Sequence, residues 1–246
     1  MHEETYYYQA EELPCQGFLC YDETLSPGQR PGILLVHTWL GLDPFMKDKA
    51  RLLAQQGYVA FCADLYGEGR VASNEEEAAS LMSPLFLDRS LLRSRIACAY
   101  EAVAKLSTVD SEAIGAIGFC FGGLTVIELL RSGLPVQGVV SFHGVIGATL
   151  GDRKAKLAPA RPFKGSLLLL HGHEDPLVTS EEIAAIEREM TLAQIDWQLH
   201  VYGQTSHAFT NPDAHSPEKG LQYQERSAKR AWCSMELFFE KLFAKR

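Results

Sequence analysis

Residues 118–123, with the sequence GFCFGG, place a cysteine directly after the short apolar run 113–117. The Gly-x-nucleophile-x-Gly pattern is typical of a nucleophile on a strained turn between a strand and a helix, where flanking side chains would collide with neighbouring backbone. Residues 124–131, LTVIELLR, can continue as that helix, and the dipole at its N-terminus favours a thiolate. We therefore predict that Cys120 is a nucleophilic thiol; a buried structural cysteine is the alternative.

Two further segments carry the side chains that such a thiol needs as partners. Residues 167–178, LLLLHGHEDPLV, join an apolar strand to a turn that presents Asp175, a suitable place for an orienting carboxylate. Residues 197–209 alternate as a strand and then deliver His207 on a loop. The order Cys120, Asp175, His207 is the nucleophile, acid, base order of α/β-hydrolases. The alternatives are an ordinary Asp-Pro turn residue for Asp175 and a loop histidine bonded to backbone for His207.

The elements that position these residues alternate between strands and helices. The patterns predict strands over 16–21, 33–36, 58–62, 113–117, 137–142, 166–171 and 196–202, and helices over 46–56, 74–82, 90–106, 121–132, 180–192 and 218–243. Strands separated by helices require right-handed crossovers, so we predict one domain, residues 1–246, with a doubly wound, mainly parallel sheet flanked by helices. Together with the order Cys120, Asp175, His207, this sheet predicts an α/β-hydrolase fold. Because ligands bind beyond the carboxyl ends of such strands, one rim should carry His37, Asp64, Cys120, His143, Asp175 and His207.

Composition limits the classes of function. The 246 residues carry a net charge of −8, which offers no basic stripe for nucleic acid and no polybasic anchor for a membrane surface. The start is acidic, and no apolar stretch approaches the roughly 20 residues that cross a bilayer, so we expect a cytoplasmic protein. The six cysteines show no Cys-x-x-Cys spacing. We expect neither a metal nor a cofactor.

With these residues in hand, the chain resembles the dienelactone hydrolase family over nearly its full length. The matching motifs are HTWLGL at 37–42, DLYG at 64–67, GFCFGG at 118–123, VSFHG at 140–144, HGHEDP at 171–176 and HAFTNP at 207–212. The resemblance implies a triad of Cys120, His207 and Asp175, and an oxyanion hole formed by the backbone N–H groups of Trp39 and Phe121. Thr38 and His143 are expected to line the substrate pocket.

The sequence departs from the family at two positions. Family members commonly carry a glutamate where Thr38 stands, and that carboxylate interacts with the resting thiol. We therefore expect Cys120 to rest more readily as a thiolate paired with an imidazolium, and Thr38 to act as a turn-capping hydroxyl. The arginine that holds a substrate carboxylate corresponds here to Asn211, so the acyl and leaving groups stay open.

These observations predict hydrolysis of a small ester, lactone or thioester through an acyl-cysteine intermediate. One alternative is a ligand-binding or scaffold protein that keeps the fold without activity. Others are a metal-dependent hydrolase built on the rim histidines and a redox thiol protein. Arginines on an amphipathic helix are usually solvated or ion-paired, so no site role is expected for Arg89, Arg93 or Arg95. The oligomeric state is left open.

Overall fold

The computed structural model describes residues 1–25, 28–158 and 160–244. Its centre is an eight-stranded sheet with the order β1-β2-β4-β3-β5-β6-β9-β10. The strands from β4 to β10 pair in parallel, whereas β1 and β2 form an antiparallel edge. Their bounds are β1 (His2–Ala10), β2 (Leu13–Tyr21), β3 (Arg30–Val36), β4 (Val59–Cys62), β5 (Val109–Phe119), β6 (Gly138–Phe142), β9 (Ser166–Gly172) and β10 (Trp197–Tyr202).

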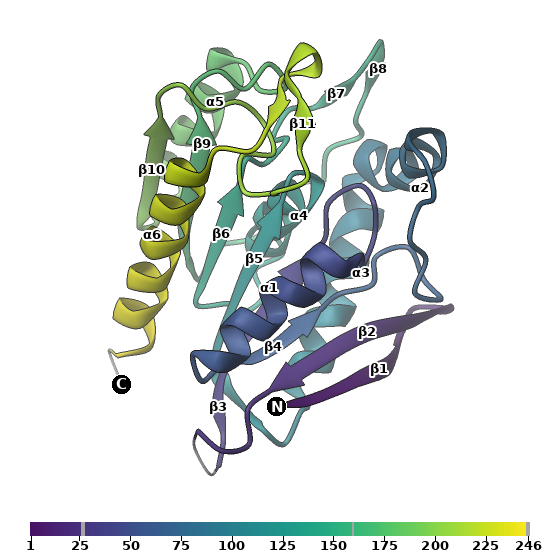
Figure 1. Ribbon diagram of the computed structural model, residues 1–246, viewed down its shortest axis with the longest axis vertical. Helices are drawn as coiled ribbons and strands as arrows, with labels where there is room; N and C mark the ends of the chain where they lie inside the picture. Colours follow the sequence, from purple (N-terminus) through teal and green to yellow (C-terminus); the bar gives the residue numbers. More distant parts are fainter. Residues whose placement is uncertain (26–27, 159, 245–246) are drawn as a thin grey trace.

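Helices cover both faces of the sheet (Figure 1). Side chains of α1 and α6 pack on one face, and those of α2, α3, α4 and α5 on the other. The bounds are α1 (Pro44–Gln55), α2 (Glu75–Leu87), α3 (Arg89–Ala104), α4 (Phe121–Arg131), α5 (Ser180–Leu192) and α6 (Glu225–Phe243). The arrangement confirms the predicted doubly wound, mainly parallel sheet.

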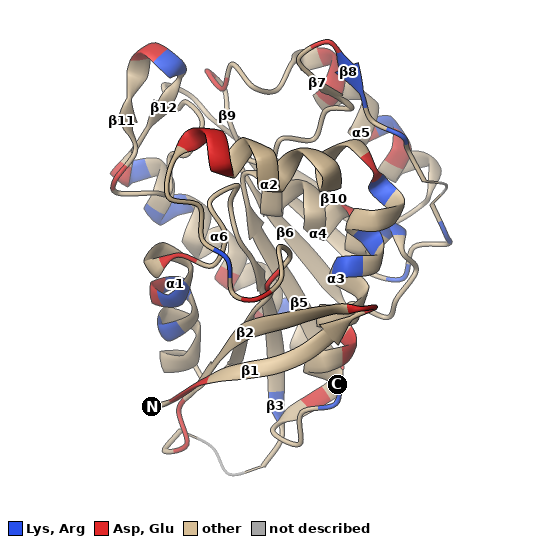
Figure 2. Cartoon of the chain, turned by 90° about the vertical axis from the view of Figure 1, so that its right-hand side faces the viewer, with Lys and Arg blue, Asp and Glu red and all other residues tan. Residues whose placement is uncertain are grey.

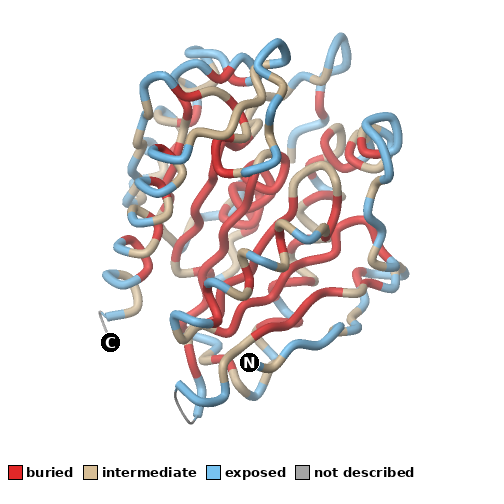
Figure 3. The backbone as a smooth tube through the Cα atoms, viewed as in Figure 1, coloured by how far each residue is buried: buried red, intermediate tan, exposed pale blue. Residues whose placement is uncertain are grey.

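The continuous aliphatic runs of the central strands follow from this two-sided cover. In β3, Ile33 and Leu35 join the core beneath α1 and α6, whereas Leu34 and Val36 join the core beneath α3 and α4. Successive side chains of a strand point to opposite faces, so a strand covered on both sides must be apolar at every position. Figure 3 shows the consequence as buried central strands with exposed segments on the outer helices.

The start of one predicted helix was wrong, and the first strand was missed. The long helix expected over 218–243 begins only at Glu225, because the preceding residues form β11 (His215–Ser216), the 3₁₀ turn η1 (Pro217–Lys219) and β12 (Leu221–Gln222). Gly220 has a φ of +70° and ends that turn, which breaks the helix locally. The first strand, β1, was missed because its half-exposed, polar residues lack the apolar run of a buried strand.

The start of α2 follows its capping signal. The Asn74 side chain accepts the Glu77 N–H (2.9 Å), as expected for the N-cap of α2. Three glutamates in the first turn of α2 complement the positive end of its dipole (Figure 2). α2 also runs past its predicted end at residue 82 to Leu87. Among the described residues, no helix is both long and apolar enough to span a membrane.

Two short strands after β6 lie outside the central sheet. β7 (Thr149–Leu150) and β8 (Arg153–Lys154) form a hairpin after β6. The residues that follow β8 are attached to the start of α3, because the Lys156 N–H donates to Leu87 O (2.7 Å) and the Arg89 N–H to Lys156 O (3.0 Å).

Candidate active site

Cys120 occupies a strained turn between β5 and α4. Its φ of 57° and ψ of −114° lie in a region that side-chain-bearing residues rarely adopt. A Cβ on Gly118 would come within 2.0 Å of Gly122 O, and a Cβ on Gly122 within 2.2 Å of Val36 O. The prediction that only glycine fits at the two positions of the motif that flank the nucleophile, 118 and 122, is confirmed. The cysteine is partly exposed, and its thiol is free.

Asp175 and His207 meet at the carboxyl end of the sheet. His207 Nδ1 lies 2.7 Å from Asp175 Oδ2, and both side chains are almost fully buried. The other carboxylate oxygen, Oδ1, accepts the Leu177 N–H at 2.9 Å. The carboxylate therefore fixes the imidazole so that Nδ1 carries a proton and Nε2 is turned away from Asp175.

The loop that carries His207 is held by the segment that sequence analysis assigned to a helix. The His207 N–H donates to Gly220 O (2.9 Å), and the Gln222 N–H donates back to His207 O (3.1 Å). The loop that carries Asp175 is bonded to the loop that carries His207, because the Glu174 N–H donates to Thr205 O (2.9 Å). Backbone hydrogen bonds thus position the loops that carry Asp175 and His207.

The electrostatics of His207 depend on Cys120. Burial by itself lowers the pKa of His207, but the negative charge of Cys120 and the hydrogen bond with Asp175 outweigh burial and raise that pKa to about 10. His207 Nε2 makes no regular hydrogen bond with any described residue. Cys120 raises the pKa of His207 mainly through its charge and to a smaller extent through a hydrogen bond.

The two backbone N–H groups expected to form an oxyanion hole come from different loops. Phe121 is the first residue of α4, where a helix has no internal acceptor for its N–H. Trp39 follows β3, and its carbonyl accepts the hydroxyl of Tyr66 (2.9 Å). Within residues 1–25, 28–158 and 160–244, neither N–H donates a hydrogen bond. No described group therefore satisfies either donor.

Tyr66, which sequence analysis did not single out, contacts the loop of the expected oxyanion donor Trp39. It is 6% exposed, and burial, with a smaller contribution from the charge of Cys120, raises the pKa of its hydroxyl. The Tyr66 hydroxyl donates to Trp39 O and so holds the peptide group between Trp39 and Leu40, which directly follows the Trp39 N–H. The available signal was the motif at 64–67, which was used for the resemblance and given no role.

The two residues expected in the substrate pocket lie in different surroundings. Thr38 is half-buried, and its hydroxyl accepts the Leu40 N–H (3.2 Å), the turn-capping bond that was expected. His143 is 2% exposed; its ring centroid lies 5.0 Å from that of His207, and its Nε2 is 2.8 Å from Thr210 Oγ1. Burial, and next the charge of His207, lower the pKa of His143 well below its usual value. His143 is thus a neutral neighbour of His207.

The remaining rim residues have structural partners. Asp64 accepts backbone N–H groups from Gln16 (2.9 Å) and Gly67 (2.8 Å) and so fixes the loop after β4. His37 Nε2 accepts the Leu65 N–H (3.3 Å), and burial lowers the pKa of His37. No group of three or more His, Cys, Asp or Glu side chains in the described part of the chain could hold a metal ion.

Comparison with known proteins identifies the relatives of this chain. The model of the dienelactone hydrolase family matches residues 18–243. A dienelactone hydrolase-like promiscuous phosphotriesterase from metagenomic libraries is 33% identical, with a TM-score of 0.89 over 98% of each chain. Protein usf of Aquifex pyrophilus is 26% identical over 216 residues, 85% of this chain and 87% of the relative.

A more distant structure shows the fold alone. The dienelactone hydrolase of Anabaena variabilis is 22% identical, with a TM-score of 0.64 over 97% of each chain. The fold is the α/β-hydrolase fold, as predicted. The protein is a hydrolase that acts on ester or lactone bonds, and it belongs to the dienelactone hydrolase family.

Proposed function

We propose that the protein hydrolyses a small ester, lactone or thioester through a covalent acyl intermediate on Cys120. The observation that carries the proposal is the buried hydrogen bond of 2.7 Å between Asp175 and His207, together with the partly exposed residue Cys120, which lies on a strained turn and acts electrostatically on His207. Nucleophile, base and orienting acid are the three parts that acyl transfer requires.

The first half of the reaction forms the acyl-enzyme. The Cys120 thiolate attacks the carbonyl carbon, and the carbonyl electron pair moves to oxygen, where the N–H groups of Trp39 and Phe121 stabilise the negative charge. The tetrahedral intermediate collapses, and His207 gives its Nε2 proton to the departing alkoxide or thiolate. Loss of one oxyanion donor typically costs about 10²–10³ in rate, so this hole is as important as the thiol.

The second half returns the enzyme to its starting state. Neutral His207 removes a proton from water, and the resulting hydroxide attacks the acyl-thioester. The thiolate of Cys120 leaves, and His207 is again an imidazolium stabilised by the Asp175 carboxylate. The raised pKa of His207, about 10, supports this role because it favours the cation in the resting pair.

The leaving group limits the substrates. A thiolate leaves a tetrahedral intermediate more readily than an alkoxide does. When the substrate's leaving group is poor, as an amide nitrogen is, the intermediate therefore expels the Cys120 thiolate and regenerates the substrate. Activated esters, enol lactones and thioesters therefore suit this nucleophile better than amides.

The test compares the native protein with Cys120→Ala on p-nitrophenyl acetate, an enol lactone and an acyl thioester. We expect Cys120→Ala to abolish turnover and to remove the acyl adduct that intact-mass spectrometry detects in the native protein. Cys233→Ala, at an exposed free cysteine of α6, is the matched control and should keep both. Turnover that survives Cys120→Ala contradicts the proposal, and a complete lack of turnover in the native protein favours a ligand-binding protein on the same fold.

One relative adds a second substrate class. The chain from metagenomic libraries, 33% identical to this one over 98% of its length, is a promiscuous phosphotriesterase. A phosphotriester with a nitrophenol leaving group therefore belongs in the same panel. Nitrophenol release that depends on Cys120 would extend the proposed reaction to phosphorus centres.

A further inference from the structure

A cavity of about 350 Å³ lies between α4, α5 and the segment after β6, and Cys120, Asp175 and His207 do not line it. Its apolar wall comes from Ile146, Leu157 and Ile186, together with several alanines. Its polar wall carries Arg89, Glu128, Arg131, Glu182 and Glu189. The volume lies in the range of small-molecule sites.

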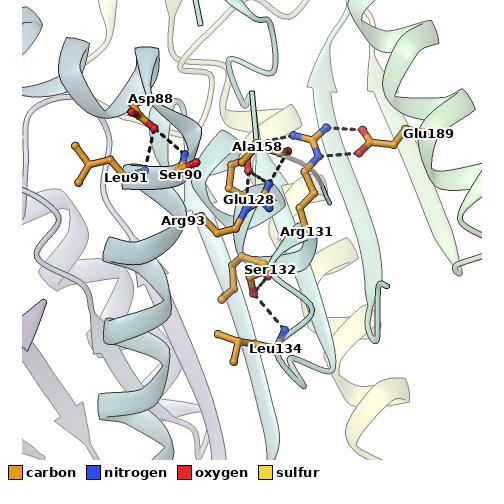
Figure 4. A network of polar contacts seen from close by, with 11 residues as sticks. Asp88, Ser90, Leu91, Arg93, Glu128, Arg131, Ser132, Leu134, Ala158 and Glu189 are labelled. Atoms are coloured by element: carbon orange, nitrogen blue, oxygen red, sulfur yellow. Dashed lines mark hydrogen bonds and ion pairs between the residues drawn. The ribbon is translucent and has the colours of Figure 1, made fainter. Parts of the chain in front are cut away.

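Two of the carboxylates in the cavity wall are already paired with arginines. Glu128 is 2% exposed; its Oε2 accepts Arg93 Nη2 (2.6 Å) and its Oε1 accepts Arg131 Nη1 (2.8 Å). Arg131 also forms a two-bond contact with Glu189, in which Nε lies 2.8 Å from Oε1 (Figure 4). All four of these carboxylate oxygens have arginine donors.

Glu182, the third carboxylate, is held at the start of α5. Its Oε2 accepts the Thr179 N–H (2.9 Å) in the capping box of that helix. It forms no ion pair with any described residue. None of these three carboxylates forms an ion pair or hydrogen bond with Arg89 among the described residues, although the charge of Glu128 partly offsets the effect of burial on the pKa of Arg89.

Arg89 is the exception to the expectation that the arginines of this helix are solvated or ion-paired. It is 1% exposed, its Nη2 donates to Gly147 O (2.7 Å), and its guanidinium carbon lies 4.4 Å from the ring centroid of Phe86. Its Nη1 is buried and has no hydrogen-bond partner among the described residues. Burial lowers the pKa of Arg89 to about 10, which still leaves it charged at neutral pH.

A buried guanidinium with a free donor at a cavity wall requires an acceptor, preferably an anionic one. The planar fork of arginine matches a carboxylate, and the aliphatic wall suits an apolar body attached to it. We propose that this cavity binds a small organic carboxylate, whose carboxylate group accepts Arg89 Nη1 and whose apolar part contacts Ile146, Leu157 and Ile186.

A short segment after β6 connects the cavity to the strained turn at Cys120. The Val145 N–H donates to Cys120 O (3.2 Å), and Gly147, two residues later, is held by Arg89. A carboxylate in the cavity would therefore contact the segment that supports Cys120 without reaching the thiol. The chemical class includes the acids that ester and lactone hydrolysis release.

The test is isothermal titration of the native protein with hexanoate and with hexanamide, its neutral counterpart. We expect hexanoate to bind at least about 10-fold more tightly than the amide, because hydrogen bonds to charged groups are the stronger ones. Arg89→Met should remove the preference for the carboxylate. Because Arg89 is buried, a second variant is needed that leaves it in place.

Ala185→Trp is that second variant. Ala185 is an exposed residue of α5 that lines the cavity, so a tryptophan there should close the mouth and weaken hexanoate binding at least about 10-fold. Leu192→Trp, at an 84% exposed position of the same helix, adds the same bulk elsewhere and should bind hexanoate as the native protein does. Equal affinity for acid and amide, unchanged binding in Ala185→Trp, or no hexanoate binding up to about 10 mM would each overturn the proposal.

Discussion

Replacing Asp175 by asparagine tests the proposed triad at the bond that defines it. Asp175 Oδ2 accepts His207 Nδ1 at 2.7 Å, while Oδ1 accepts the Leu177 N–H at 2.9 Å. In Asp175→Asn the amide oxygen keeps the bond to Leu177, so the NH₂ group faces His207 Nδ1. That nitrogen must then accept, and the imidazole proton moves to Nε2, where it prevents His207 from receiving a proton.

The expected loss follows from two effects. Removing a hydrogen bond to a charged group costs about 1.5–3 kcal/mol, or about 10- to 150-fold in rate. The wrong tautomer adds to this, as in serine proteases, where the same substitution lowers kcat by about 10⁴. We expect kcat/KM for p-nitrophenyl acetate to fall by about 10²–10⁴ in Asp175→Asn.

The control is Asp213→Asn, the same change at an exposed carboxylate in the loop after His207. It should leave kcat/KM unchanged, and circular dichroism should show both variants folded. A loss smaller than about tenfold in a folded Asp175→Asn protein would refute the reasoning, because the carboxylate would then not set the tautomer.

Two further predictions concern stability. The folded-state pKa of His207 is raised to about 10, above an unfolded value of about 6.5, so its contribution to stability is fully present below about pH 6.5 and is lost as pH rises through about 10. The melting temperature of the native protein should therefore fall more steeply towards high pH than that of His207→Gln, and parallel curves would contradict the assigned shift. Gly122→Ala should lower the free energy of unfolding by about 1–3 kcal/mol in urea titrations, because the new Cβ would lie 2.2 Å from Val36 O. Gly203→Ala, where a Cβ meets nothing within 4 Å, is the control; equal stability of the two variants would show that the turn tolerates a side chain.

The parts of the fold that were predictable have local causes. The apolar runs of β3, β5, β6 and β9 are buried on both faces, so a strand of that kind is visible in the sequence itself. Glycine on both sides of Cys120 indicated the strained turn, since any Cβ there meets backbone. The strand β1 carried no such signal because it is half-exposed and gains its stability by pairing with β2.

The wrong helix start near residue 218 has a tertiary cause. Residues 220 and 222 exchange backbone hydrogen bonds with His207, which is distant in sequence, and those bonds compete with helix formation. Arg89 illustrates the same limit at the level of one side chain. Its position on a helix suggested solvent or an ion pair, whereas the packing of the segment after β6 buries it against Gly147.

The sequence alone determined the alternation of the central strands and helices, the strained turn at Cys120, and the types and order of the side chains that follow the strands. It did so because hydrophobic periodicity and glycine sterics act over a few neighbouring residues. Only the tertiary structure decided that Asp175 and His207 lie 2.7 Å apart, that the raised pKa of His207 depends on Cys120, and that Arg89 faces a cavity. Distances, burial and charge pairing arise between segments far apart in the chain, and no local pattern encodes them.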